Sequence, residues 1–123
     1  MWEKYNPNPL SKLVGDCVIR ALTKALDRTW GEIYLGLCIQ GYIVGDLPSS
    51  NHVWGLYLKN NGFERNFISD DTYTIEDFCK DHPEGTFVLG TGSHAVTVCS
   101  GKYYDAWESG KEIPIYYWKR KED

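Results

Sequence analysis

The stretch DCVIRALTKALD, residues 16–27, determines how the first half of the chain folds. Its apolar residues recur at spacings of three and four: Val18, Ala21, Leu22, Ala25 and Leu26. This spacing predicts a helix with one buried face, and Asp16 is a favourable N-cap for it. Cys17 then lies in the first turn. The stretch poses a question, because Cys17 could be a small core residue or a nucleophile.

Capping signals and β-branched runs predict the remaining elements. Three more helices are indicated: one opened by the capping box TWGE at 29–32 and reaching about Ile39, one capped by Ser50 or Asn51, and a short one capped by Thr74. Runs rich in β-branched and aromatic residues predict strands at 63–69, 85–91, 93–100, 102–109 and 113–120. This order predicts an α+β fold in one domain, 1–123, with the N-terminal helices packed on an antiparallel sheet.

Composition and charge narrow the classes of function. The formal net charge is −4, and the basic cluster at 119–121 is followed at once by two acidic residues, so we predict no nucleic-acid partner. No apolar run approaches the ~18 residues of a membrane span, and residues 1–14 lack a signal-peptide core, so we expect a cytoplasmic protein without membrane contact. The long, irregular spacing of the four cysteines favours free thiols over disulfides or a zinc site.

The position predicted for Cys17 favours a reactive thiol. A helix N-terminus has unpaired N–H groups and the positive end of the helix dipole, and both lower the pKa of a thiol placed there. The same N–H groups could hold the oxyanion of a tetrahedral intermediate. Gly15 has no side chain, so a substrate backbone could come close to it.

A base and an orienting carboxylate are predicted to lie near one another. His94 follows the turn GTGS and opens the strand HAVTV, which puts it at the mouth of the sheet. A hairpin folded at 100–102 puts Asp105 on the neighbouring strand, nearly level with Val96 and His94. Its carboxylate could then accept from the ring of His94 and set the tautomer. Alternatively, His94 makes only a structural hydrogen bond and Asp105 faces solvent.

These segments together resemble the papain-like cysteine peptidases. The resemblance covers about Asn6 to Trp107 and is carried by GDCVIRAL, GSHAV and YYDAW. Within this superfamily, the chain looks most like the small single-domain members found in bacteria and their phages, including the C39-like type. GDCVIRAL is also similar to the nucleophile segment D-G-N-C-L-F-R-A of the ovarian-tumour deubiquitinases. The resemblance implies that Cys17 is the nucleophile, His94 the general base and Asp105 the third member of a triad.

The resemblance also bears on the oxyanion hole. Papain completes that hole with a Gln six residues before its Cys, and here the position is Ser11. Asn8 or Asn6, in the extended leader, could supply an amide donor instead. Asp16 matches an Asn that precedes the nucleophile of the ovarian-tumour enzymes, although its side chain could cap the helix and would then oppose a thiolate.

Aromatic side chains are the candidates for substrate binding. Trp54, Trp107, Tyr103 and Tyr104 could line a groove, or they could be core residues. Trp107 lies two residues beyond Asp105, so we expect it on the same face of the same strand. In papain-like sites an indole often shields the third triad residue from water, and Trp107 matches that role.

We therefore expect a cysteine peptidase or related thiol hydrolase that acts on an amide or isopeptide bond of a protein or peptide, without a cofactor. One alternative is a catalytically inactive papain-like module that binds a protein, including one encoded by a phage. Another is a metal site formed by Cys17, His94 and Asp105. The metal site is the weaker alternative, because no two of these ligands have the close spacing typical of such sites.

Overall fold

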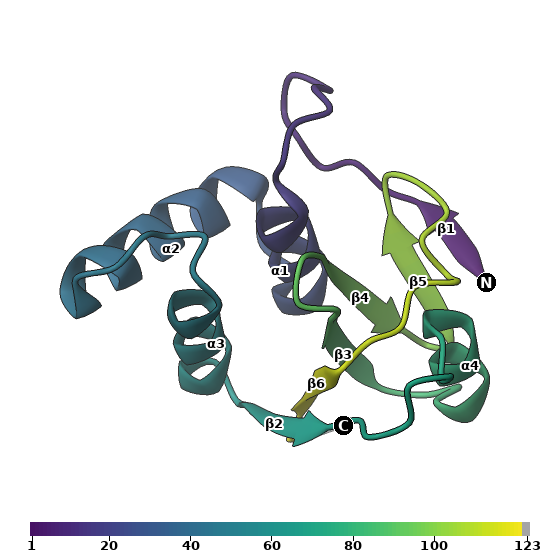
Figure 1. The fold of residues 1–123 in the computed structure, drawn as a ribbon. Helices are drawn as coiled ribbons and strands as arrows, with labels where there is room; N and C mark the ends of the chain where they lie inside the picture. The colour runs from purple at the N-terminus through teal and green to yellow at the C-terminus, as the bar shows by residue number, and fades with distance from the viewer. Residues whose placement is uncertain (122–123) are drawn as a thin grey trace.

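Helix α1 (Cys17–Leu26) packs against the middle of a mixed sheet in the computed structural model, which describes residues 1–121 (Figure 1). The described helices are α1, α2 (Trp30–Val44), α3 (Asn51–Asn60) and α4 (Ile75–Asp81). The described strands are β1 (Trp2–Lys4), β2 (Phe63–Phe67), β3 (Thr86–Gly90), β4 (Ala95–Cys99), β5 (Lys102–Asp105) and β6 (Tyr116–Arg120). The predicted α+β class is confirmed.

The sheet is mixed, which corrects the predicted antiparallel sheet. Its strand order is β1-β5-β4-β3-β6-β2, and β1 pairs with β5 in parallel while the other neighbours are antiparallel. The prediction missed β1 because three residues carry no measurable alternation. Tertiary contacts hold the strand instead: the indole of Trp2 donates to the carbonyl oxygen of Asp105 at 3.0 Å, and the N–H of Tyr5 donates to the same oxygen at 2.8 Å.

Helices cover both faces of the sheet, so the molecule has two cores. One core lies between the sheet and α1, α2 and α3, and includes Leu22, Trp54 and Val88. The other lies under α4 and includes Phe78 and Leu89. Successive residues of β3 point to opposite faces, and both faces are covered, which explains why all five residues of β3 are buried.

Helix boundaries follow the predicted caps closely at the start and less well at the end. Thr29 and Thr74 both form capping boxes, as predicted. Helix α2 continues to Val44 and stops at Gly45, whose φ of 78° is the left-handed conformation of a C-cap. The predicted end near Ile39 is wrong because α2 is apolar on nearly all sides, so no change in periodicity marks its end.

The β4–β5 hairpin has the predicted turn and register. Cys99 pairs with Lys102, and Thr97 pairs with Tyr104, so Asp105 comes level with Val96 at the next position. Strand β5 ends at Asp105, however, two residues before Trp107. Trp107 therefore lies in the bend after the strand, which corrects its predicted place on the strand.

A buried hydrogen bond ties α1 to β4. The hydroxyl of Thr97 donates to the carbonyl oxygen of Ala21 at 2.6 Å, and Thr97 is fully buried. Thr23, on the same helix, is also buried, but its hydroxyl has no hydrogen-bond partner. The two threonines form a matched pair for testing what holds the helix on the sheet.

We predict that Thr97→Val lowers the free energy of unfolding by about 1 kcal/mol, because it removes a buried hydrogen bond at nearly constant volume. Thr23→Val should leave this free energy unchanged or raise it, because its hydroxyl is buried without a partner. Urea unfolding of the two variants measures both effects. Equal losses in both would show that the bond from Thr97 to α1 does not stabilise the fold.

Candidate active site

Cys17 is the first residue of α1, and its thiol faces the β4 side of the helix. Asp16 occupies the N-cap position, and its carbonyl oxygen accepts from the N–H of Arg20 at 2.8 Å, which is the first bond of the helix. The N–H of Cys17 therefore precedes the helical ladder. The thiol is half-buried and lies beside the side chain of His94 and the backbone of Ala95.

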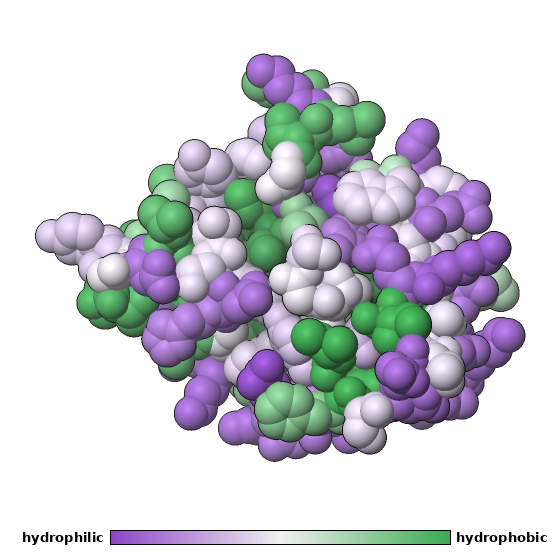
Figure 2. Space-filling view, in the orientation of Figure 1, coloured by the Kyte–Doolittle hydropathy of each residue, from purple (hydrophilic) through white to green (hydrophobic). Residues whose placement is uncertain are grey.

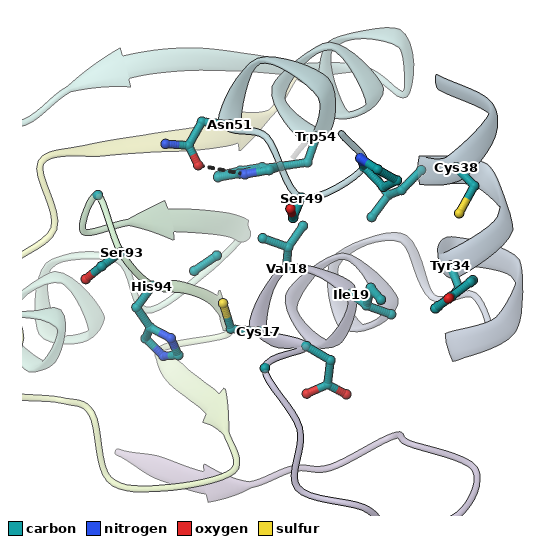
Figure 3. A pocket seen from close by; sticks show the side chains of 16 residues that line it. Cys17, Val18, Ile19, Tyr34, Cys38, Ser49, Asn51, Trp54, Ser93 and His94 are labelled. Atoms are coloured by element: carbon teal, nitrogen blue, oxygen red, sulfur yellow. Dashed lines mark hydrogen bonds between the residues drawn. The ribbon is translucent and has the colours of Figure 1, made fainter. Parts of the chain in front are cut away.

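A tight turn positions His94 beside that thiol. The N–H of Thr91 donates to the carbonyl oxygen of His94 at 2.9 Å, and Gly92 in the turn has a φ of 99°, which favours glycine. The turn ends at the start of β4, and the imidazole points from there toward Cys17 (Figure 3). The side chain of His94 is 7% exposed.

His94 connects the thiol to a buried carboxylate. Its Nε2 lies 2.6 Å from Oδ2 of Asp105, and Asp105 is fully buried. An ionised carboxylate only accepts hydrogen bonds, so Nε2 carries the hydrogen and donates it. Nδ1 is then the nitrogen that remains to exchange a proton with the neighbouring thiol of Cys17. The structure thus brings the three predicted residues together, with the thiol beside the imidazole and the imidazole bonded to the carboxylate.

The electrostatics of these side chains favour a thiolate at Cys17 and an imidazolium at His94. Burial raises the pKa of Cys17, but the hydrogen bonds from His94 and Ala95 and the charges of His94 and Arg20 outweigh it, so the net pKa is lowered. Burial lowers the pKa of His94, but its hydrogen bonds to Asp105 and Cys17 raise it to about 9. Each group therefore stabilises the charged form of the other.

Asp105 is held by several donors at the end of β5. Arg20 donates to its Oδ1 at 3.0 Å, the N–H of Ala106 donates to the same oxygen at 2.8 Å, and the hydroxyl of Ser109 donates to Oδ2. Burial raises the pKa of Asp105, but the bonds from His94 and Ser109 and the charges of His94 and Arg20 lower it overall. The carboxylate is therefore fixed in place and ionised.

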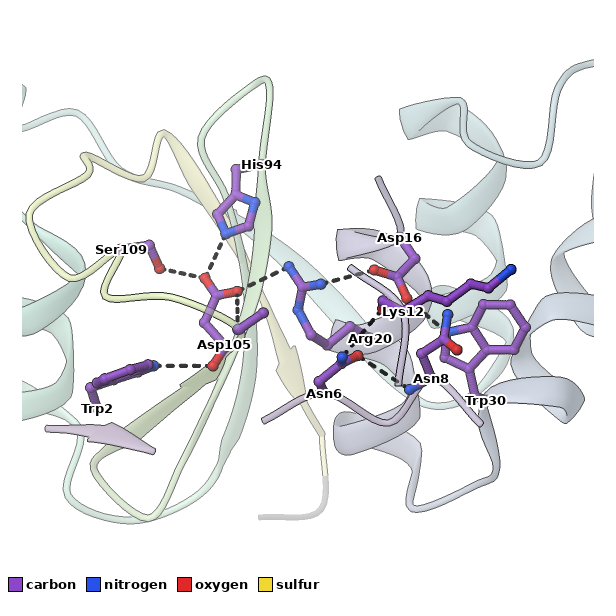
Figure 4. A network of polar contacts seen from close by, with 11 residues as sticks. Trp2, Asn6, Asn8, Lys12, Asp16, Arg20, Trp30, His94, Asp105 and Ser109 are labelled. Carbon is purple, nitrogen blue, oxygen red and sulfur yellow. Dashed lines mark hydrogen bonds and ion pairs between the residues drawn. The ribbon is translucent and has the colours of Figure 1, made fainter. Parts of the chain in front are cut away.

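Arg20 links Asp105 to a second buried carboxylate (Figure 4). Its guanidinium donates to Oδ1 of Asp16 at 2.9 Å as well as to Asp105, and it is 3% exposed. Oδ2 of Asp16 accepts from the indole of Trp30 at 2.9 Å. One buried cation thus serves two buried anions, and the network joins α1, α2 and β5.

A cavity of about 450 Å³ opens beside Cys17 and His94. Most of its wall is apolar, formed by α1, α2 and α3: Val18, Ile19, Tyr34, Leu37, Cys38 and Trp54. Its polar rim comes from Ser49, Asn51 and Ser93 (Figure 3). Hydrophobic side chains also gather outside the cavity, over α2 at the left and over the loop after β1 at the top (Figure 2). Beside the thiol of Cys17, the molecule therefore presents a largely uncharged recess.

The structure does not bring the predicted amide donors to the thiol. Nδ2 of Asn6 donates to the carbonyl oxygen of Lys12 at 3.2 Å, and its Oδ1 accepts from the N–H of Asn8 at 3.3 Å. Oδ1 of Asn8 accepts from the N–H of Leu10 at 2.9 Å. These local turns hold both amides within the loop after β1, and neither lines the cavity.

Asp16 borders the cavity but cannot donate to an oxyanion. Its backbone N–H donates to the carbonyl oxygen of Val14 at 2.8 Å, and its carboxylate binds Arg20 and Trp30. It makes no side-chain cap of the helix either. Gly15 does line the cavity, and the space where a Cβ would stand is open, which leaves room for a substrate chain.

The two predicted tryptophans take different positions. Trp54 is 1% exposed, stacks on Tyr116 and forms part of the cavity wall, so it is a core residue with one face toward the cavity. Trp107 does not line the cavity. Its ring lies 4.7 Å from the ring of His94 and 5.2 Å from the guanidinium carbon of Arg20, and it is 48% exposed. Trp107 therefore covers His94 and Arg20 from the solvent side.

Sequence reasoning missed Arg20, Ser109 and Asn51. Arg20 stands four residues after Asp16, a spacing at which opposite charges pair along a helix, so its bond to Asp16 was open to prediction. Ser109 reaches Asp105 through an irregular loop, which has no sequence signal. Oδ1 of Asn51 accepts from the indole of Trp54 at 3.0 Å, and this contact depends on the start of α3.

Cys17, Cys38, Cys79 and Cys99 are all free thiols, as predicted. Within residues 1–121, no three or more His, Cys, Asp or Glu side chains are grouped so that they could hold a metal ion. Over the same residues, every helix is too short or too polar to span a bilayer. No family model, curated protein or solved structure matches the chain.

We predict that iodoacetamide alkylates Cys17 faster than Cys38, Cys79 and Cys99 at pH 7, because its lowered pKa increases the thiolate fraction. His94→Ala should slow the alkylation of Cys17 at this pH by about tenfold or more, since the bond and the charge that lower the pKa are lost. Peptide mass spectrometry across a pH series measures the four rates.

His52→Ala serves as the control for this experiment, because His52 is exposed and lies outside the cavity wall. It should leave the alkylation profile of Cys17 unchanged. A Cys17 that titrates near about 8.5 in the wild type, and equally so without His94, would contradict the ion pair.

We further predict that Arg20→Met lowers the free energy of unfolding by about 3–5 kcal/mol, because it leaves two buried carboxylates without their shared cation. Arg28→Met is the matched control: its guanidinium is exposed and bonds to Tyr57 and Asn61, so the loss should stay below about 1 kcal/mol. Chemical denaturation measures both. Similar losses in the two variants would contradict a central role for Arg20.

Proposed function

We propose that this protein is a thiol hydrolase of the cysteine peptidase type, which cleaves an amide or isopeptide bond with Cys17, His94 and Asp105. The observation that carries the proposal is the placement of the Cys17 thiol beside His94, whose ring is hydrogen-bonded to the buried Asp105, at the edge of a cavity. A nucleophile, a base and a group that orients the base are the parts that covalent acyl transfer needs.

The proposed reaction proceeds in two steps. In the first, the thiolate of Cys17 attacks the carbonyl carbon and forms a C–S bond, and the carbonyl electron pair moves to oxygen. The C–N bond then breaks as His94 gives its proton to the leaving amine. In the second, His94 takes a proton from water, the hydroxide attacks the thioester, and the C–S bond breaks to release the acid and the thiolate.

The surroundings of Cys17 support this chemistry. Its backbone N–H precedes the helical ladder and is available to the developing oxyanion. Among residues 1–121, Asp16 is the one charged residue in the cavity wall apart from Cys17 and His94, and its carboxylate is bound by Arg20 and Trp30. The cavity therefore suits an uncharged, apolar part of the substrate. Four free thiols agree with a reducing compartment, so we propose that the enzyme works in the cytoplasm.

A protein-binding module is the second candidate, and the outer face of α2 favours it. Leu35, Ile39, Tyr42 and Ile43 are between 61% and 89% exposed, and such a group of apolar side chains is typical of an interaction site. The two candidates differ in what they require of the thiol: a module of this kind would bind its partner equally well with Cys17→Ala.

We predict that hydrolysis of a fluorogenic peptide library depends on pH in a bell shape. The rate should rise as Cys17 ionises through its lowered pKa, and it should fall above about pH 9 as His94 loses its proton. Asp105→Asn should move the alkaline limit to lower pH, because the charge that raises the pKa of His94 is gone.

Cys17→Ala sets the background of this assay and should abolish hydrolysis. Lys80→Gln, on the opposite face of the sheet, is the control for a change in net charge and should retain the wild-type profile. A wild-type protein that forms no thioester with any peptide, and whose Cys17 resists a peptidyl vinyl sulfone, would contradict the proposed function and favour the binding module.

A further inference from the structure

A second cavity, of about 290 Å³, lies between α3 and the β6–β2 edge of the sheet. Figure 1 shows α3 beside β2 at this edge. Trp118 and Tyr116 of β6 form part of its wall, and Gly55 of α3 lets the ring of Trp118 come close, because a Cβ there would stand 2.9 Å from that ring. The wall is therefore an aromatic surface held against a helix.

The charges around this cavity have one sign. Lys59, Arg65 and His52 line it, and no carboxylate among the described residues does. Within residues 1–121, neither Lys59 nor Arg65 forms a salt bridge. Glu64, next to Arg65, points to the opposite face of β2, because successive strand residues alternate. The charge of the cavity wall is therefore opposite in sign to the net charge of −4 of the whole chain.

Arg65 is held in position by aromatic rings. Its guanidinium carbon lies 4.4 Å from the centre of the Tyr116 ring and 4.8 Å from that of Phe67. Stacking on the rings restricts the Arg65 side chain, while the N–H groups at the edges of its planar guanidinium remain free to donate hydrogen bonds. A planar guanidinium fixed in this way suits a carboxylate, which it can bind with two parallel hydrogen bonds.

The second cavity borders the cavity at Cys17. Asn51 lines both of them, so the start of α3 is their common wall. Its Oδ1 accepts from the indole of Trp54 at 3.0 Å, which turns its Nδ2 outward (Figure 3). An amide N–H fixed in this way can donate to a backbone carbonyl of a chain that passes over it. The two cavities then form one binding path with an apolar part and a cationic part.

We propose that the second cavity binds an acidic side chain of the peptide substrate, while an apolar residue of the same peptide occupies the cavity at Cys17. This inference rests on the proposed function, since it describes the substrate of that site. Lys59 and Arg65 supply the charge, and Asn51 holds the peptide backbone between the two cavities. Two exposed cations on an acidic protein suit a short acidic segment, whereas a nucleic acid backbone needs a longer basic surface.

The test uses the full chain with Cys17→Ala and two fluorescent peptides, both with Leu at the centre and with either Glu or Gln on both flanks. We expect the Glu peptide to bind about tenfold more tightly at low salt, and this preference should shrink as salt is added. The double variant Lys59→Gln with Arg65→Gln should bind both peptides equally. Fluorescence anisotropy gives the dissociation constants.

The control is the double variant Lys80→Gln with Lys111→Gln, which changes the net charge equally but touches neither cavity. It should retain the preference for Glu. The proposal would be overturned if both double variants lost the preference for the Glu peptide equally, or if the protein with Cys17→Ala alone showed no such preference. A single-stranded oligonucleotide that displaces the Glu peptide at lower concentration than the unlabelled peptide itself would also overturn it.

Failure of the proposed function has a different signature. Wild-type protein is incubated with the same peptides, and cleavage is read by mass spectrometry. A Glu peptide that binds with the expected preference but is never cleaved counts against the thiol hydrolase alone. If the Glu and Gln peptides are cleaved at the same rate, the result counts against the cationic cavity alone. Asn51→Ala should weaken the binding of both peptides by the same factor, because the Asn51 side chain is proposed to hold the peptide backbone and not the flanking side chains.

Discussion

The buried guanidinium of Arg20 is the interaction on which the rest of the site depends. It lies between Asp16, at the start of α1, and Asp105, at the end of β5, at 2.9 and 3.0 Å. Two carboxylates at these depths would be too costly without a shared cation. Through this one side chain, the helix that carries the thiol is oriented against the strand that carries the carboxylate.

Within this site, the charge of each group shifts the pKa of its neighbour. Against the effect of burial, Asp105 and Cys17 together raise the pKa of His94 to about 9, and protonated His94 in turn lowers the pKa of Cys17. Trp107 covers His94 and Arg20 from solvent, which keeps water from weakening these interactions. Arg20 therefore lowers the pKa of Cys17 in two ways, directly by its charge and indirectly by holding Asp105 beside His94.

The sheet gives this network a rigid frame. Asp105 ends β5, His94 precedes β4, and the hairpin register places the two side by side. Parallel pairing of β1 brings Trp2 and Tyr5 to the carbonyl oxygen of Asp105, so even the N-terminus helps to hold the carboxylate. Each contact is modest by itself, but they converge on one residue and leave it little freedom.

The sequence by itself determined the local elements and pointed to Cys17, His94 and Asp105 as the site residues. Periodic apolar residues predicted α1, capping boxes predicted the starts of α2 and α4, and the hairpin turn brought Asp105 level with Val96, two residues after His94. Only the tertiary structure decided the parallel β1, the role of Arg20 between two carboxylates, and the cationic cavity beside Asn51. The physical reason is range: caps and periodicity act within a few residues, whereas these features join positions far apart in the chain.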